Sequence, residues 1–158
     1  MKRLTCIFLL VFVNNVFTQN EVDFGVKGGV NLTFFNVSQA GFGLNNQSEL
    51  GYYGGLFADV MVSEEFSIQP ELLYIGIKDF NFINVPIYAK YEVAENLALL
   101  AGPSLNYFFD FFSNKFKVRA DISSAYQVSS KLDVHMKYTL GFEELSPNSL
   151  FFGLGYRL

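Results

Sequence analysis

His135 is the only histidine of the chain and the one side chain that could act as a base near neutral pH. Asp133 lies two residues before it, and Ser123 lies in the preceding segment. A serine, a histidine and an aspartate in contact form a hydrolase triad, so cleavage of lipid or polypeptide is one chemistry that this set allows. Such substrates would be attacked at a surface, whereas these residues fall on the inward face derived below. We therefore interpret His135 as a hydrogen-bonded or ion-paired structural residue and expect no enzymatic activity.

Other chemistries have less support in the sequence. One histidine and one early cysteine, Cys6, leave only scattered carboxylates as metal ligands, so we expect no metal site. Gly25, Gly28 and Gly29 lie within a strand pattern and precede no helix, so they do not form a phosphate-binding loop. The formal net charge of −4 and the pI of about 4.9 argue against nucleic acid as a partner. We expect no catalytic residue and no cofactor.

The N-terminus has the pattern of a secretory signal peptide. Lys2 and Arg3 precede an almost wholly apolar stretch, residues 4–13, and a short polar stretch follows. We predict that residues 1–18 form the signal peptide, which is cut before Gln19 and takes Cys6 with it. Residues 19–158 then form a single domain without cysteine, which excludes a disulfide framework.

From residue 23 onward, apolar and polar residues alternate with a period of two, as in half-buried β-strands. In the first segment Phe24, Val26 and Val30 share one face, and Lys27 and Asn31 share the other. No helix of ordinary length is needed. The predicted strands span residues 23–34, 51–62, 66–77, 83–93, 97–109, 116–128, 132–142 and 149–158. The fold class predicted is all-β, an eight-stranded antiparallel up-and-down transmembrane β-barrel.

Two features favour a membrane barrel over a soluble barrel of the lipocalin type, whose apolar face points inward. Aromatic residues on the apolar face gather near the strand ends, as in the interfacial girdles of membrane barrels. Three connections are three-residue turns, residues 63–65, 94–96 and 129–131, and the others are longer. The predicted girdles are Phe24, Phe66, Tyr91, Tyr126 and Tyr156 at one end, and Phe34, Tyr52, Tyr74, Tyr107, Phe109, Phe116 and Phe152 at the other.

The polar face carries nearly balanced charges and many glycines, which suits a narrow lumen filled by ion-paired side chains. A selective pore would show a bias of one sign. Counting outward from the connections places Glu71 opposite Lys90 and Asp133 opposite Arg157, and we predict these two ion pairs. The remaining lumen charges assigned to the ion-paired network are Lys27, Asp59, Arg119, Asp121 and Lys137. Pro70, Pro86 and Pro103 predict bulges or strand breaks.

Several segments resemble a known family. They are Gly25-Val26-Lys27-Gly28-Gly29-Val30-Asn31, Gln69-Pro70-Glu71-Leu72-Leu73-Tyr74 and the closing Gly153-Leu154-Gly155-Tyr156-Arg157-Leu158. This set resembles the small outer-membrane β-barrel family labelled PorT-like, similar in architecture to the OmpA membrane domain. The resemblance implies an eight-stranded barrel in the outer membrane of a Gram-negative bacterium. The namesake's link to a secretion system implies an accessory role in protein secretion.

The sequence leaves three function classes open. The first, which we favour, is a structural or interaction protein that presents its external loops, chiefly residues 35–50, to an extracellular or envelope partner. The second is a lipid-modifying or proteolytic barrel enzyme with His135 as its base. The third is a small passive channel. In each case the expected surroundings are outer-membrane lipid and, during biogenesis, the barrel-assembly machinery.

Overall fold

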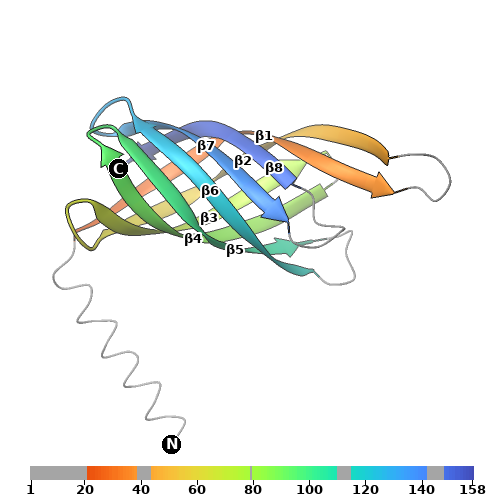
Figure 1. Ribbon diagram of the computed structural model, residues 1–158, viewed down its shortest axis with the longest axis horizontal. Coiled ribbons are helices and arrows are strands. Elements are labelled where there is room, and N and C mark those ends of the chain that lie inside the picture. Colours follow the sequence, from red (N-terminus) through yellow and green to blue (C-terminus); the bar gives the residue numbers. More distant parts are fainter. Residues whose placement is uncertain (1–20, 39–43, 79, 110–114, 142–147) are drawn as a thin grey trace, which may run out of the picture.

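The computed structural model describes residues 21–38, 44–78, 80–109, 115–141 and 148–158, which form one closed barrel (Figure 1). Each strand pairs antiparallel with the next in the chain, and the first pairs with the last. The predicted signal peptide, residues 1–18, lies outside the described residues. The strands are β1 (Val22–Ser38), β2 (Leu44–Met61), β3 (Phe66–Ile77), β4 (Phe80–Ala94), β5 (Leu97–Phe108), β6 (Phe116–Gln127), β7 (Leu132–Gly141) and β8 (Asn148–Arg157).

The alternation in the sequence corresponds to an apolar outer wall and a more polar lumen, which confirms the predicted faces. Phe24, Leu56 and Ile122 point outward with 61%, 57% and 55% of their surface exposed. Lys27, Asp59, Glu71, Lys90, Arg119, Asp121 and Lys137 are all buried in the lumen. This distribution is the reverse of that in a water-soluble barrel and is the arrangement of a barrel that crosses a membrane.

The predicted aromatic girdles lie on the outer wall. At one end Phe66 is the cross-strand partner of Tyr91, and Phe24, Tyr126 and Tyr156 are exposed. At the other end the rings contact one another: the Tyr107 ring lies 4.9 Å from Phe116 and 5.7 Å from Phe109, which in turn lies 6.5 Å from Tyr74. Amphipathic rings at these levels mark where the apolar wall would meet the two surfaces of a bilayer.

The first two strands extend beyond the rest of the barrel, so the prediction of a loop over residues 35–50 is wrong. β1 and β2 stay paired from Phe35 with Gln47 to Ser38 with Leu44, and only residues 39–43 between them are outside the described part. Figure 1 shows this hairpin projecting past the other strands. The strand pattern was not recognised there because Asn, Gln and Ser replace the apolar residues that mark the outer wall elsewhere.

The three prolines do not break the strands, contrary to the prediction. The register between β2 and β3 is the same on both sides of Pro70, from Phe57 with Glu71 to Val60 with Ile68. Between β4 and β5 the pairing is interrupted beside Pro86 and Pro103, but the register is the same on both sides, from Pro86 with Ser104 to Ala89 with Ala101. Each proline removes one hydrogen-bond donor, and the pairs on either side hold the register. The register shift found between β4 and β5 lies instead between Glu92 and Ala94.

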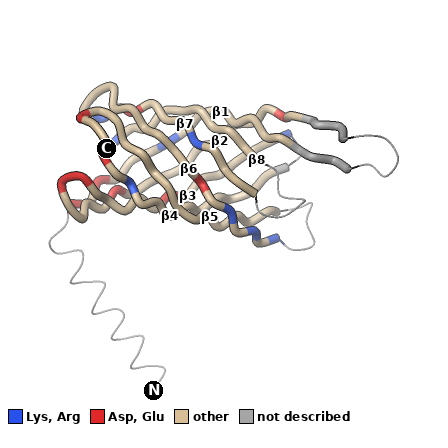
Figure 2. Tube along the Cα trace, viewed as in Figure 1, with Lys and Arg blue, Asp and Glu red and all other residues tan. Residues whose placement is uncertain are grey.

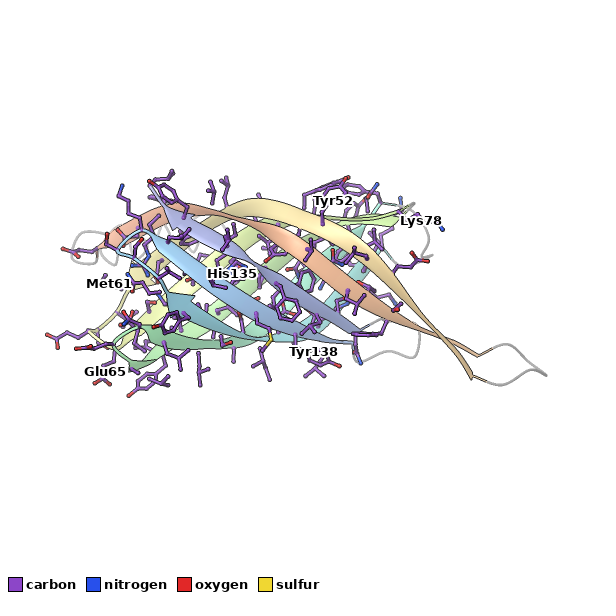
Figure 3. All side chains as sticks on the ribbon, turned by 90° about the horizontal axis from the view of Figure 1, so that it is seen from above. Tyr52, Met61, Glu65, Lys78, His135 and Tyr138 are labelled. Atoms are coloured by element: carbon purple, nitrogen blue, oxygen red, sulfur yellow. The ribbon has the colours of Figure 1, made fainter. Side chains whose placement is uncertain are left out.

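The two ends of the barrel differ. The start of β1 and the end of β8 lie at the same end of the barrel, which also carries the turns 62–65, 95–96 and 128–131 (Figure 1). Acidic residues gather at this end (Figure 2). Figure 3 places Met61 and Glu65 at this short-turn end and Tyr52 and Lys78 at the hairpin end. Among the described residues, no helix is long and apolar enough to cross a membrane.

The outer wall makes a direct prediction. Ala89 and Ala120 lie on the outer wall away from both ends, and an arginine at either position would place a charge within the apolar layer. Ala89→Arg and Ala120→Arg should each lower the free energy of unfolding by about 2–4 kcal/mol. Ser48→Arg, on the projecting hairpin, should change it little. Urea unfolding in lipid vesicles measures all three, and equal costs would contradict the assignment of faces.

Candidate functional site

The lumen contains most of the polar chemistry of this molecule, and its two shortest ion pairs join strands that are not adjacent. Lys27 Nζ on β1 lies 2.5 Å from Glu71 Oε1 on β3. Lys90 Nζ on β4 lies 2.5 Å from Asp59 Oδ2 on β2. The predicted pair of Glu71 with Lys90 is therefore wrong, although all four residues are buried in the lumen as expected. The physical reason is that each lysine reaches across an intervening strand instead of pairing with a direct neighbour.

Glycines make these crossings possible. Gly55 on β2 is the cross-strand partner of Lys27 and also of Leu73 on β3, so it stands between the strands that carry Lys27 and Glu71. With no side chain at this inward position, the Lys27 side chain can cross β2, and its Nζ lies 5.1 Å from the centre of the Phe57 ring. A Cβ atom on Gly55 would also collide with the Leu72 carbonyl oxygen.

The second predicted pair also differs from the observed contacts. Asp133 lies closest to His135, with 3.1 Å between Asp133 Oδ1 and His135 Nδ1. Arg157 Nη2 lies 3.8 Å from Asp59 Oδ2. The cross-strand partner of Asp133 is Gly155, and the carboxylate of Asp133 occupies the space that a side chain there would fill. Asp133 and Arg157 thus belong to one polar cluster at the short-turn end, with other nearest partners than predicted.

His135 is bound between an aspartate and a tyrosine. Its Nε2 lies 2.6 Å from the Tyr53 hydroxyl, and its Nδ1 faces Asp133. Tyr53 is on β2 and His135 on β7, and the strands between them place Gly29 and Gly153 in the same row. Tyr53 therefore lies across two glycines, and a side chain at 153 would overlap its hydroxyl. Figure 3 shows where His135 lies on the barrel.

The contacts of Ser123 do not assemble a hydrolase triad. Ser123 Oγ donates a hydrogen bond to the Met136 carbonyl oxygen at 3.0 Å. Both nitrogens of His135 are already in contact with Asp133 and Tyr53. A nucleophilic serine would need the histidine nitrogen that Tyr53 occupies. The observed arrangement instead gives each of Ser123, Tyr53, Asp133 and His135 a hydrogen-bond partner.

A second polar cluster centres on Asp121. Its carboxylate accepts hydrogen bonds from Tyr88 at 3.1 Å and from Ser104 at 3.0 Å. Lys137 Nζ lies 3.7 Å from Asp121 and donates a hydrogen bond of 2.9 Å to the Asn84 side chain. These contacts join β4, β5, β6 and β7, so the buried charges of Asp121 and Lys137 are compensated by groups from several strands.

The sequence analysis missed an apolar cluster in the lumen. Phe82, Phe108 and Phe151 are at most 2% exposed, although they occupy inward positions. Arg119 lies among them, its guanidinium 5.7 Å from the Phe82 ring and 5.1 Å from the Phe108 ring. The signal was present, because these residues share the period-two phase of the charges. The cluster comprises Tyr53, Leu73, Ile75, Ile77, Phe82, Phe108 and Phe151.

The polar clusters and the apolar cluster together fill the lumen. At the short-turn end, a pocket lined by Lys27, Lys90, Asp133 and Arg157 among others has a volume of about 30 Å³. A space of this size has room for about two water molecules. Among the described residues, no three His, Cys, Asp or Glu side chains are grouped as a metal site requires. The arrangement can hold charges, and its described part offers little room for a substrate.

The ion pairs can be tested by exchange. Lys27→Met or Glu71→Gln should each lower the free energy of unfolding by about 3–5 kcal/mol, because each leaves a buried charge without its partner. The double variant Lys27→Glu with Glu71→Lys should recover much of that loss. The matched control exchanges Glu71 with Lys90, which are not paired, and should recover nothing. Recovery in the control alone would contradict the observed pairing.

The apolar cluster predicts that the lumen is closed to ions. The unmodified protein should give little or no steady conductance in a planar bilayer, because a charge that passes the apolar cluster with Phe82, Phe108 and Phe151 would lose its hydration. Replacing all three by alanine should produce a measurable current. The exposed Phe24, also replaced by alanine, serves as the control. A large ion-selective current from the unmodified protein would replace the closed lumen with a channel.

Comparisons with known proteins agree with the fold. No family model and no curated protein sequence matches the chain. Among solved structures, the chain is similar to Ail, the attachment invasion locus protein of Yersinia pestis, in complex with the heparin analogue sucrose octasulfate. The TM-score is 0.57 and the identity 13%, over 87% of this chain and 99% of that one.

Two further structures have the same architecture. A designed transmembrane β-barrel has a TM-score of 0.54 and 19% identity, over 85% of this chain and 96% of that one. The outer-membrane protein OprG of Pseudomonas aeruginosa has a TM-score of 0.50 and 13% identity, over 88% and 97%. At these identities the likeness establishes the fold, that of the small eight-stranded transmembrane barrels.

Proposed function

We propose that this protein resides in the outer membrane of a Gram-negative bacterium and acts through its external surface, chiefly the β1–β2 hairpin. The observation that supports this most directly is the hairpin itself, which continues past the aromatic girdle while the other strands end near it. Ordering the backbone of these extra residues costs conformational entropy. Beyond the girdle, the paired strands do not help the barrel to cross a bilayer. An interaction outside the membrane would give this extension a use.

The filled lumen supports the same proposal. Among the described residues, Lys27 is paired with Glu71 and Lys90 with Asp59, and an apolar cluster occupies part of the lumen. Transport through the barrel and chemistry inside it would both need space that the side chains occupy. The surfaces at the two ends are then where partners can be met.

The finer part of the proposal concerns the role of that interaction. The PorT-like resemblance supports an accessory role in protein secretion, in which the barrel holds a partner at the cell surface. The name of Ail describes attachment and invasion, and its structure was determined with a heparin analogue. Those words describe Ail, and for this chain they support only the general proposal of a surface contact. We also propose that the protein is not an enzyme, because both ring nitrogens of His135 are held by structural contacts.

A paired labelling experiment in intact cells tests the location and the interaction. Ser48 lies on the hairpin and Ser130 in a short turn, and both are exposed serines at opposite ends. In cells that express Ser48→Cys, a membrane-impermeant maleimide should label the protein, whereas Ser130→Cys should stay unlabelled. The protein should fractionate with the outer membrane and migrate faster on gels before boiling, because a closed barrel resists detergent.

A photo-cross-linker placed at residue 48 should then capture a partner that the same group at residue 130 does not. A soluble periplasmic protein, or labelling at residue 130 alone, would overturn the proposed location. Capture of the same molecules from both positions would overturn the proposed interaction surface.

A further inference from the structure

The β1–β2 hairpin has a free edge that no other strand in the described part of the chain covers. On one side, β2 pairs with β1 from Leu44 onward. On the other side, its pairing with β3 begins only at Tyr52 with Gly76. Gly51 still lies beside Gly76 and Ile77 at the end of β3, so residues 44–50 leave one side of their backbone without a described neighbour. β3 ends at Ile77, and in the turn that follows it only residue 79 is outside the described part, so this turn is too short to cover the edge.

The second edge of the hairpin is shorter. β1 pairs with β8 up to Phe34 with Asn148, which leaves Phe35 to Ser38 beyond that ladder. The connection next to this edge, residues 142–147, lies outside the described residues. Among the described residues, the β2 edge is thus the longer of the two.

The β2 edge lacks the usual features that prevent strand addition. Natural proteins protect exposed edges with proline, lysine, bulges or very short strands. Residues 44–51 read Leu-Asn-Asn-Gln-Ser-Glu-Leu-Gly, which contains no proline and no lysine. The ladder with β1 runs without a register shift through all 17 pairs. Glu49 is the only charged residue of this edge. A regular edge of this kind presents alternate N–H and C=O groups in the geometry that another strand requires.

We propose that residues 44–50 bind an extended segment of another protein, which adds as a strand to the free edge of β2. This inference rests on the proposed function and specifies its partner class. The partner is recognised through its backbone, so it must be extended and free of proline over about four to eight residues, while its side chains matter less.

A second copy of this chain fits the edge less well. Two copies in one membrane have the same orientation, so their β2 strands would pair parallel, which is the weaker arrangement. Pairing β2 of one copy with β1 of the next would be antiparallel, but only residues 35–38 of β1 lie beyond β8. Repetition of that contact would generate an open chain of copies. The geometry therefore favours a different polypeptide.

Amide hydrogen exchange on the full barrel in phospholipid nanodiscs tests the proposal. The probe is a synthetic peptide with the sequence of residues 31–38, Asn-Leu-Thr-Phe-Phe-Asn-Val-Ser, which already matches residues 44–51 through the opposite edge. Without peptide, alternate amides of residues 44–50 should exchange rapidly, because their N–H groups face solvent. Saturating peptide should slow these amides by roughly tenfold or more and leave the β1-paired amides unchanged.

Two controls sharpen the test. The same peptide with proline in place of its second phenylalanine and its second asparagine should have no effect. Asn46→Pro or Gln47→Pro, whichever position has the rapidly exchanging amide, should abolish the slowing while the barrel keeps its heat-dependent gel mobility. A periplasmic-turn proline, Ser130→Pro, should leave the slowing intact.

The outcomes separate this inference from the proposed function. No slowing by the peptide, or slowing confined to residues 35–38, overturns strand addition at β2. If amide exchange on the β2 edge slows with rising protein concentration in the absence of peptide, the partner is a second copy and the proposed partner class is wrong. If residue 48 captures a surface partner in cells and the peptide slows no amide, the proposed function stands and the strand-addition mechanism is wrong.

Discussion

The small space inside eight strands is the constraint on which the rest of this structure depends. A barrel of this size has room for its inward side chains and for little else, so every large residue must lie across its neighbours. Glycines at Gly29, Gly55, Gly153 and Gly155 supply that room, and they decide which partners meet: Tyr53 with His135 and Lys27 with Glu71. Because these partners are on non-adjacent strands, the lumen is one network and not a set of neighbouring pairs.

The apolar outer wall and the filled lumen follow from one requirement. In a bilayer, all backbone polar groups must be paired within the protein, which a sheet achieves only by closing on itself. Closure gives each strand one face toward lipid and one toward the lumen, so the sequence must alternate. β3 is the clearest case, since Ile68, Leu72 and Tyr74 are exposed while Gln69, Glu71 and Leu73 are buried.

The same alternation explains how much could be predicted. The alternation of apolar and polar residues is a local property of the sequence. It was therefore enough to predict all eight strands, the bounds of β3 and the inward position of every lumen charge named above. The partner of Glu71 could not be derived this way, because it depends on how far a lysine reaches across β2 in three dimensions. Counting from a turn assumes that only adjacent strands interact. The hairpin end was missed for another reason: outside the bilayer no solvent difference separates the two faces, so the pattern disappears.

The bond between Tyr53 and His135 has a consequence for the order of assembly. It joins β2 to β7 across the seam where β1 meets β8, and 82 residues of chain separate its ends. Until the first and last strands have met, its two ends lie on opposite margins of an open sheet. It therefore contributes nothing to the early steps of folding and stabilises only the closed state. An interaction of this kind acts on the rate of unfolding, so it works as a latch that keeps the finished barrel from reopening.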